Sequence, residues 1–402
     1  MSAGWEIRKA GDIFEMTDFV SNGSFASLRE NVEYLDHPDY AVLVRLADYS
    51  NGFDSSKFVY VSKQSYEYLA KSKLFGGEII MSNVGSVGKS FICPDLGCPM
   101  TIGPNVVLIR SKNNAFYQYY FQTEEFQQKL LSISSKATLL KFNKTNFKAL
   151  DIPVPSLPEQ QRIVDVLDRE FAKIAALKAN AEKSLQMAKD LFQATLKKAL
   201  KPKKGWKVSS MGDVSSIARG GSPRPIKAFI TEDADGINWI KIGDTEVGGK
   251  YISSTKEKIR KEGMRSSRFV EAGDFLLSNS MSFGRPYILK TNGCIHDGWL
   301  VIKKYEDTFT QDFLYYLLLS PSVVKQFEEG ARGSTVRNLN TDIVSAVRVS
   351  YPSALQEQEE IVARVEEQNY KCKALQDNYQ KTLTLCDDLK QSLLRKAFNG
   401  EL

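Results

Sequence analysis

The stretch PSLPEQQRIV at residues 155–164 decides the architecture of this chain, because it begins a long helix. Ser156 and Glu159 have the spacing of a capping box, in which each side chain accepts a hydrogen bond from the backbone N–H of the other residue. After the box there is no glycine, and no further proline before Pro202. The sequence therefore predicts a helix of about 43 residues, roughly 65 Å long at a rise of 1.5 Å per residue.

A second long helix is predicted within the last 50 or so residues. Ser353 and Gln356 have the same spacing, and no glycine follows before Gly400. Both segments carry apolar residues at alternating intervals of four and three, interrupted by Lys178 in the first, and such a heptad stripe needs a partner helix. We expect the two helices to pair as an antiparallel coiled coil; the alternative is that each helix packs only on its own globular domain. The stripes consist of Leu167, Phe171, Ile174, Ala181, Leu185, Ala188 and Phe192, and of Ile361, Val365, Cys372, Leu375, Tyr379, Cys386, Leu389 and Leu393.

The segments outside the helices are also duplicated, in the same order. Gly4-Trp5-Glu6 returns as Gly205-Trp206-Lys207. The run from Gly77 to Asn83 returns as the run from Gly273 to Asn279. Because repeats in a fixed order indicate duplicated structural units, we expect two globular domains of the same fold.

Each globular domain is predicted to be α+β. Tyr40–Val44 and Ile237–Ile240 are short runs of β-branched and aromatic residues between turn residues, which indicates strands. Residues 116–131 and 311–327 carry aromatic residues and leucines at helical spacing. The predicted fold is therefore two duplicated α+β domains separated by two long helices that form an antiparallel coiled coil with pseudo-two-fold symmetry. The domains cover residues 1–155 and 202–352, and the helical regions cover residues 156–201 and 353–402.

The composition excludes several classes of protein. The 402 residues carry 54 Lys and Arg against 48 Asp and Glu, a net charge of +6, so a nucleic-acid surface would depend on local clustering of charge. Only two histidines, His37 and His296, are available, which excludes most hydrolytic triads and zinc sites. The five cysteines lack a metal-binding spacing. No apolar run is long enough to span a bilayer, and we expect a cytoplasmic protein without a metal site.

Residues 83–90, NVGSVGKS, are similar to the phosphate-binding loop of ATPases. That loop requires glycine at its first position so that its backbone amides can approach the phosphates, and Asn83 occupies this position. The second copy reads Gly284-Arg285-Pro286 and has no serine where magnesium would bind. We therefore expect no ATPase activity, and the absence of an Asp/Asn-Pro-Pro-aromatic motif predicts no amino-methyltransferase activity.

Four motifs together resemble the specificity subunits of type I restriction-modification systems. The opening of the first long helix, residues 155–164, resembles the start of that family's central conserved helix, and residues 393–402 resemble its usual ending, with residues 191–200 as a degenerate counterpart. Gly220-Gly221-Ser222-Pro223 followed by residues 239–244 resembles a frequent opening of the family's target-recognition domains. The second helix departs from the pattern at Ala354-Leu355-Gln356 and has Glu359-Glu360 where the first has Gln161-Arg162.

The resemblance implies a non-catalytic, sequence-specific DNA-binding subunit. Each recognition domain would read one half of a bipartite, asymmetric site in double-stranded DNA, and the helices would set the spacer between the halves. Two methyltransferase (M) subunits would dock on the helices, and two restriction (R) subunits would join them. S-adenosylmethionine, ATP and Mg²⁺ would be used by these partners, and no cofactor by this chain.

Matched polar and basic positions in the two copies are the candidate DNA contacts, because duplicated readers should present equivalent loops to the duplex. Arg and Lys can bond guanine, Asn can bond adenine, and Lys often contacts phosphate. The alternative for each is a solvated surface residue or a turn constraint, and the alternative for the whole chain is a coiled-coil scaffold that assembles proteins without reading DNA. The candidates are Arg45, Ser82, Asn83, Lys89, Lys141, Asn143, Arg219, Arg224, Lys241, Ser278, Asn279, Arg285, Arg337 and Asn340.

Overall fold

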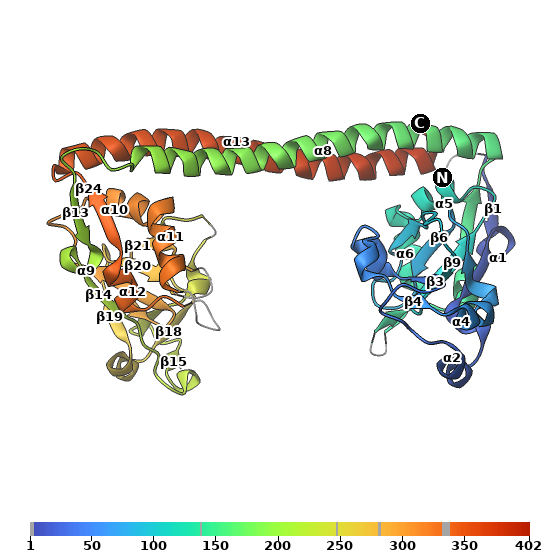
Figure 1. Ribbon diagram of the computed structural model, residues 1–402, viewed down its shortest axis with the longest axis horizontal. Helices are drawn as coiled ribbons and strands as arrows, with labels where there is room; N and C mark the ends of the chain where they lie inside the picture. The colour runs from blue at the N-terminus through green and yellow to red at the C-terminus, as the bar shows by residue number, and fades with distance from the viewer. Residues whose placement is uncertain (1–3, 137–138, 247, 280–282, 332–337) are drawn as a thin grey trace. The chain divides into compact units, whose positions relative to one another are not determined.

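The computed structural model describes residues 4–136, 139–246, 248–279, 283–331 and 338–402. The chain divides into two compact units, one formed by Met1–Asn180 with Thr382–Leu402 and the other by Ala181–Lys381 (Figure 1). Each unit contains one globular domain and a segment of each long helix, α8 (Leu157–Ala199) and α13 (Leu355–Asn399). The expected helix of 43 residues is present in α8, and α13 has 45 residues.

Within the described residues, the globular domain of the first unit contains two four-stranded sheets and two separate strand pairs, β1-β12 and β10-β11. One sheet has the order β2-β9-β6-β7 and is antiparallel, and the other has the order β4-β3-β8-β5 with β3 and β8 parallel. Its strands are β1 (Glu6–Lys9), β2 (Glu15–Asp18), β3 (Ala41–Val44), β4 (Tyr60–Val61), β5 (Lys73–Leu74), β6 (Ile79–Ser82), β7 (Ser90–Ile92), β8 (Met100–Ile102), β9 (Val106–Arg110), β10 (Ser135–Lys136), β11 (Leu140–Lys141) and β12 (Asp151–Val154). Its helices are α1 (Ala10–Ile13), α2 (Phe25–Asn31), α3 (Leu46–Ser50), α4 (Lys63–Tyr68), α5 (Asn114–Tyr120), α6 (Glu124–Ser132) and α7 (Lys144–Lys148).

The second unit repeats this plan with small additions. Its sheets have the orders β14-β23-β20-β21-β17 and β15-β18-β16-β22-β19, and β16 pairs with β22 in parallel, as β3 does with β8. Its strands are β13 (Lys207–Ser210), β14 (Ser216–Arg219), β15 (Ile230–Thr231), β16 (Ile237–Ile240), β17 (Tyr251–Ile252), β18 (Glu257–Ile259), β19 (Arg268–Val270), β20 (Phe275–Ser278), β21 (Pro286–Leu289), β22 (Gly293–Ile295), β23 (Trp299–Lys303) and β24 (Arg348–Tyr351). Its helices are α9 (Met211–Val214), α10 (Gln311–Leu318), α11 (Pro321–Gly330) and α12 (Thr341–Ala346). The predicted α+β duplication is confirmed.

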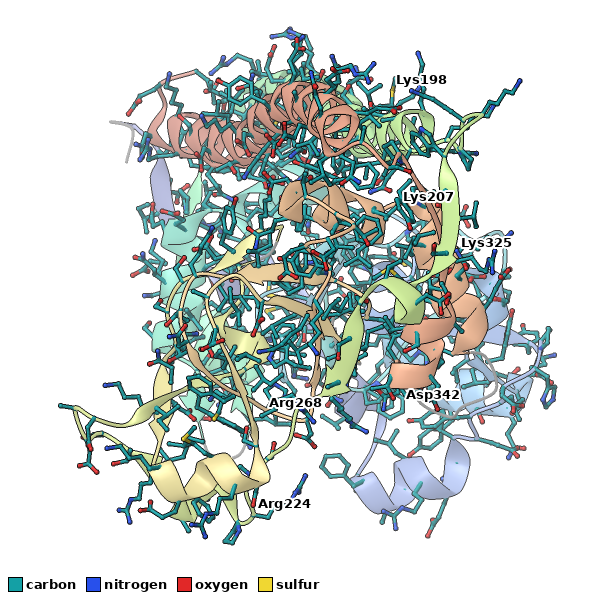
Figure 2. The ribbon with its side chains drawn as sticks, turned by 90° about the vertical axis from the view of Figure 1, so that its left-hand side faces the viewer. Lys198, Lys207, Arg224, Arg268, Lys325 and Asp342 are labelled. Atoms are coloured by element: carbon teal, nitrogen blue, oxygen red, sulfur yellow. The ribbon has the colours of Figure 1, made fainter. Side chains whose placement is uncertain are left out.

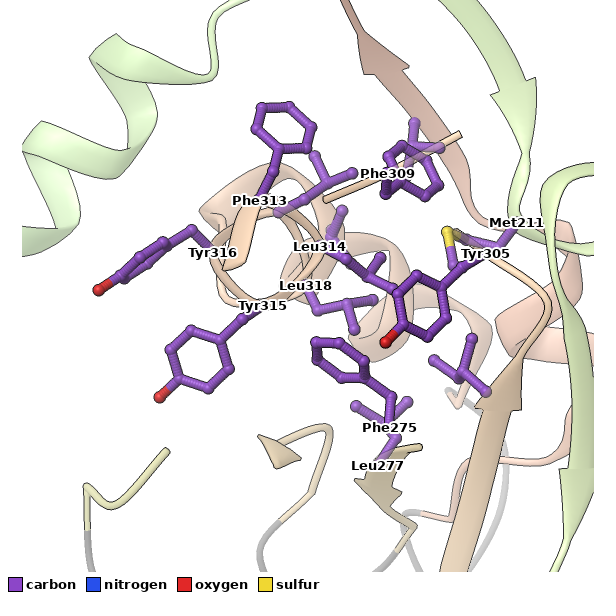
Figure 3. Packing of buried hydrophobic residues seen from close by; sticks show 14 of the residues in the cluster. Met211, Phe275, Leu277, Tyr305, Phe309, Phe313, Leu314, Tyr315, Tyr316 and Leu318 are labelled. Atoms are coloured by element: carbon purple, nitrogen blue, oxygen red, sulfur yellow. The ribbon is translucent and has the colours of Figure 1, made fainter. Parts of the chain in front are cut away.

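The central strands are buried on both faces, which explains their continuous apolar sequence. Alternate residues of β20 point to opposite sides of the sheet, so Phe275 and Leu277 enter one buried cluster and Leu276 enters another. On the first side they share a cluster with Phe313 and Leu314 of α10, and Figure 3 shows Leu318 of this helix beside Phe275. In the first unit β6 separates two clusters in the same way.

The helices predicted at residues 116–131 and 311–327 are each divided in two. The first helix ends at Tyr120, and Thr123 caps the next, because its side chain accepts a hydrogen bond from the backbone N–H of Phe126 at 3.2 Å. Pro321 opens α11 directly after α10, since proline lacks the N–H that would continue the earlier helix. The helical spacing of the apolar residues continues across both breaks, so it did not predict that either helix would be divided.

The two long helices pair within each unit, as expected from their heptad stripes. In the first unit Leu167 of α8 shares a buried cluster with Leu394 and Phe398 of α13, so the beginning of α8 packs beside the end of α13. Lys178, which interrupts the stripe, lies 2.7 Å from the carboxylate of Asp387 on α13. Each helix also packs on its globular domain, so the two packing alternatives occur together.

In the second unit the order of the helix segments is reversed. Leu196 of α8 shares a cluster with Ile361 and Val365 of α13, so the end of α8 packs beside the beginning of α13 and the two helices run antiparallel. The heptad pattern placed Leu375 of this unit and Leu389 of the first unit in the stripe. Their side chains are 41% and 48% exposed, so both lie outside the buried contact between the helices.

The start of α13 differs from the prediction. Ser156 caps α8 and accepts a hydrogen bond from the backbone N–H of Glu159 at 3.4 Å. The helix α13 begins at Leu355, which puts Ala354, and not Ser353, at the N-cap. Because an N-cap side chain must lie directly before the helix, the capping box expected at Ser353 does not form.

Candidate DNA interface

The loop resembling a phosphate-binding loop is a turn between two antiparallel strands. Ser82 ends β6 and Ser90 begins β7, so the loop does not lead into a helix. Phosphate loops rely on the N–H groups at a helix N-terminus, and this arrangement lacks them. Gly85 and Gly88 have φ angles of 78° and 85°, which only glycine adopts readily, so they shape the turn.

In the first unit this turn lies against the segment that precedes α7. Val84 forms a β-bridge with Lys141, and the backbone N–H of Phe142 donates to the carbonyl of Asn83 at 3.2 Å. Asn143 is the N-cap of α7 and accepts from the N–H of Asn146 at 2.7 Å. The structure thus brings the candidates Asn83, Lys141 and Asn143 together.

The equivalent segments meet in the same way in the second unit. The backbone N–H of Leu339 donates to the carbonyl of Asn279 at 2.8 Å. Asn340 is the N-cap of α12 and accepts from the N–H of Ile343 at 2.8 Å. Arg285 is exposed in the turn between β20 and β21, and Arg337 lies outside the described residues.

Three of the candidates are buried and support the turns from inside. Ser82 donates to the carbonyl of Val84 at 3.0 Å. Ser278 accepts from the backbone N–H of Arg285 at 3.0 Å, and Asn279 donates to the carbonyl of Asp297 at 2.8 Å. Because these side chains bond within the domain, they hold the turns in place, and base contact by them stays a prediction.

Asn83 differs from its buried counterpart Asn279. Its Oδ1 atom is buried without a hydrogen-bond partner among the described residues, and the side chain lines a cavity of about 550 Å³. Phe25, Arg29 and Tyr34 line the same cavity, and the Phe25 side chain is 82% exposed. No repeated motif or basic run marks these three residues in the sequence, so they were not among the predicted contacts.

Asp297 contacts three candidates of the second unit, Asn279, Arg219 and Arg224, and it was not among the predicted residues. Its carboxylate accepts from the Ser222 hydroxyl at 2.6 Å and pairs with Arg224 at 3.4 Å, and its backbone carbonyl accepts from Arg219 Nε at 3.2 Å. The hydrogen bond from Ser222 and the charge of Arg224 hold the pKa of Asp297 below its usual value. Arg224 and Arg268 lie at the end of the domain away from Lys198 on α8 (Figure 2).

The Gly-Gly turn before Ser222 is required by close backbone contacts. A Cβ atom at Gly220 would lie 2.2 Å from the carbonyl oxygen of His296, and one at Gly221 would lie 2.7 Å from that of Ser266. These distances are too short for any side chain, so the turn can pass only with glycine at both positions.

A cavity of about 1030 Å³ adjoins this turn. Trp239 and Ile226 contribute apolar surface to it, and Arg224 and Lys241 contribute charge. Lys241 Nζ lies 2.5 Å from Glu257, so an ion pair orients this candidate.

The remaining two candidates, Arg45 and Lys89, lie in the first unit. Arg45 forms a two-pronged ion pair with the buried Asp48 at 2.7 and 3.1 Å, which raises the pKa of the guanidinium. Lys89 is exposed, and its ammonium lies 3.3 Å from Ser50 Oγ and 5.7 Å from the Tyr49 ring centre. Arg45 therefore has a structural role, whereas Lys89 is open to a ligand.

The described residues contain no group of three or more His, Cys, Asp or Glu side chains placed to hold a metal ion. Within the same ranges, no helix is both long and apolar enough to cross a membrane.

Comparison with known proteins identifies the class that this fold represents. The family model for the type I restriction modification DNA specificity domain matches residues 2–186 and again residues 203–384. The chain therefore belongs to the family of type I restriction-modification specificity subunits and carries two DNA specificity domains.

The chain is similar to specificity subunits of individual restriction enzymes. It is 24% identical over 393 residues to the EcoKI specificity subunit of Escherichia coli (strain K12), covering 90% of this chain and 83% of that protein. It is also 24% identical over 402 residues to the StySPI specificity subunit of Salmonella potsdam, with coverage of 90% and 83%.

Solved structures share the fold. A chain from a structure described as "complex assembly and conformational transition of the type I R-M system" aligns with a TM-score of 0.75 at 17% identity, covering 100% of this chain and 99% of that chain. The HsdS subunit from Thermoanaerobacter tengcongensis aligns with a TM-score of 0.53 at 17% identity, covering 100% and 98%.

Proposed function

We propose that each globular domain reads one half of a bipartite, asymmetric site in double-stranded DNA. The observation that carries this proposal is the matched contact of two segments in both units, through Phe142 and Asn83 in one and Leu339 and Asn279 in the other. Duplicated loops held in the same way on divergent domains suit two readers with separate specificities. A scaffold that only assembles proteins would not need this arrangement.

The contacts to DNA are assigned to the exposed and half-buried members of the candidate set, apart from Arg45, which is paired with Asp48. Arginine and asparagine bond base edges in the major groove, and lysine contacts phosphate more often. The proposed contacts are Asn83, Lys89, Lys141 and Asn143 in the first unit and Arg219, Arg224, Lys241, Arg285 and Asn340 in the second, with Ser82, Ser278 and Asn279 as supports.

The long helices are proposed to dock two methyltransferase subunits, which two restriction subunits then join. Leu177, Leu385 and Leu389 are exposed on the helix segments of the first unit, and Met187 and Leu191 on those of the second. Exposed apolar side chains gathered on a helix mark a surface that a partner covers. The helices would also set the length of the spacer between the half-sites.

Catalysis is assigned to the partner subunits, and the chain is proposed to act in the cytoplasm. S-adenosylmethionine would serve the methyltransferase subunits, ATP and Mg²⁺ the restriction subunits, and no cofactor this chain. Purified chain is expected to turn over neither S-adenosylmethionine nor ATP. Product formed by the isolated protein in either assay would contradict the assignment.

The experiment that tests the reading of half-sites is an exchange of residues 1–155 for the first recognition domain of another specificity subunit. The parent and hybrid chains are each co-expressed with the methyltransferase subunit, and the methylated adenines of the host DNA are sequenced. We expect the hybrid to change one half of the target and keep the other. A change in both halves, or methylation that does not depend on this chain, would contradict the proposal.

A further inference from the structure

Each recognition domain meets its long helix through an apolar contact. In the first unit Phe116 and Tyr120 of α5 share a buried cluster with Leu167 of α8. In the second unit Phe313 and Leu317 of α10 share one with Val365 of α13. Apolar burial is non-directional, so it holds a domain on a helix without selecting one angle between them.

A directional contact is added to this packing in the first unit. The hydroxyl of Tyr119, on α5, donates a hydrogen bond to Asp168 Oδ1 on α8. The Tyr119 ring meets the Phe171 ring edge-on, with centres 5.3 Å apart and planes at 88°. Burial and the neighbouring Asp168 raise the pKa of Tyr119, so the hydroxyl stays a donor. Because a hydrogen bond has a preferred geometry, this one restricts the rotation of the domain about the apolar contact.

The second unit has the equivalent contact. Tyr316 of α10 lies with its hydroxyl 3.5 Å from Glu366 Oε1 on α13. Asp168 and Glu366 hold equivalent positions, at the same distance along the chain from Glu159 and Glu357 of the two helix openings. Figure 3 shows Tyr316 on the side of α10 away from Tyr305.

A partly buried lysine strengthens this second contact. Lys250 Nζ, from the residue before β17, lies 3.0 Å from Glu366 and 2.7 Å from Asp312 of α10. Its side chain is 16% exposed and lies within 5.4 Å of the ring centres of Tyr315 and Tyr316. Burial alone would lower the pKa of Lys250, but the two carboxylates raise it. The lysine therefore remains charged and ties the domain to α13.

We propose that Asp168 and Glu366 are positioning residues that set the angle of each recognition domain on its helix, and thereby the spacer lengths that the protein accepts. The inference rests on the proposed reading of a bipartite site. In this proposal the loops determine which bases each half-site contains, and these two contacts determine which spacer lengths are accepted. The same tyrosine–carboxylate pair in both copies, beside apolar packing that is not directional, supports this division.

The test uses the chain assembled with its methyltransferase subunit. Targets carry the two half-sites, identified first by sequencing methylated adenines, with the native spacer or with one base pair more or fewer. The variants are Glu366→Ala and Tyr119→Phe, the second of which removes only a hydroxyl. The matched controls are Glu367→Ala, whose carboxylate pairs with Lys371 of the same helix at 2.6 Å, and Asp165→Ala, whose carboxylate accepts from Gln161 at 2.8 Å.

We expect both variants to keep the half-site sequences and to lose preference for the native spacer. The ratio of methylation at the native spacer to that at altered spacers should fall about tenfold with Glu366→Ala, equivalent to roughly 1.4 kcal/mol, and less with Tyr119→Phe. The controls should keep the parent ratio.

Two outcomes would overturn the inference, and both differ from failure of the proposed function. One is a spacer ratio in Tyr119→Phe and Glu366→Ala equal to that of the controls. The other is a loss of half-site sequence preference at every spacer. If Glu366→Ala does not fold, as thermal unfolding would show, the result with Tyr119→Phe decides. If the parent complex itself shows no preference for any sequence, the proposed function fails.

Discussion

Gln160 and Gln358 are buried at the same place in the two long helices, and each donates a side-chain hydrogen bond to a proline carbonyl. Gln160 Nε2 lies 2.9 Å from the carbonyl oxygen of Pro155, and Gln358 Nε2 lies 3.0 Å from that of Pro352. The glutamine therefore ties the first turn of each helix to the strand that leads into it. This contact explains why the two helix openings share a glutamine although their N-caps differ.

The two glutamines should differ in their contribution to stability. Gln358 also donates to the carbonyl of Thr308 at 2.8 Å and accepts from the N–H of Thr310 at 2.9 Å, whereas Gln160 Oε1 has no hydrogen-bond partner among the described residues. Gln358→Ala should lower the free energy of unfolding by about 2–3 kcal/mol, and Gln160→Ala by about 1 kcal/mol, because the first leaves more buried groups unsatisfied. Calorimetric unfolding of the two variants measures the difference. Equal losses would contradict this account.

The stability of the second recognition domain should depend on pH through the ionisation of Asp297. Its pKa is lowered in the folded state, so its ionised form stabilises the fold above the unfolded-state pKa, and this contribution is lost as the pH falls through the lower folded-state value. Asp297→Asn should therefore destabilise the protein at pH 7, and the difference from the parent should shrink below about pH 4. Thermal unfolding midpoints between pH 7 and pH 3 test this. A difference that stays constant over this range would show that the carboxylate charge is not responsible.

The exposed cations Lys89 and Arg285 should give different signatures in DNA binding. Substituting alanine for a side chain that binds a base should cost about 1–3 kcal/mol and relax one position of the site, while the same change at a phosphate-binding side chain should weaken all sequences alike and reduce the salt slope by about 1. We expect the first result for Arg285→Ala and the second for Lys89→Ala. Titrations at several salt concentrations measure both quantities.

A matched control for these variants is Lys325→Ala on α11. Lys325 is also exposed and pairs only weakly, at 3.8 Å, with Glu329 of the same helix (Figure 2). It should leave affinity and salt slope unchanged. If Lys325→Ala has the same effect as Arg285→Ala, general charge and not the turn accounts for binding.

The length of the long helices should set the length of the spacer between the half-sites. Adding one heptad to each helix, between Lys178 and Ala179 and between Leu375 and Gln376, keeps the stripes in register and adds roughly 10 Å. This length corresponds to about 3 base pairs at 3.4 Å each, and the added pairs also rotate the second half-site around the duplex. The original site should be lost, and any new site should keep its half-sequences across a longer gap.

The control for this prediction is a heptad added to one helix alone, which should mismatch the stripes and lower the unfolding temperature. Sequencing of methylated adenines reports the spacer that each variant accepts. If the doubly extended protein folds and methylates only the original spacing, the helices do not set the gap.

The long helices and the duplication could be determined from the sequence alone. Capping, the absence of glycine and heptad spacing act over a few residues, so local sequence carries them, as the extent of α8 from Leu157 to Ala199 confirms. The same local reasoning was wrong at Ser353 by one residue. There, α13 follows strand β24, and the buried Gln358 bonds back to Pro352 after that strand.

The site was decided by tertiary structure. Asn83 and Asn279 are equivalent in sequence, yet Asn279 bonds Asp297 inside its domain while Asn83 lines a cavity beside Phe25. Asp297 accepts hydrogen bonds from Ser222 and Arg224, which lie more than 70 positions away in the chain. Repeated motifs mark equivalent positions but not what packs beside them. The exposure of a side chain and its partners depend on contacts between distant segments, which form only when the sheets assemble.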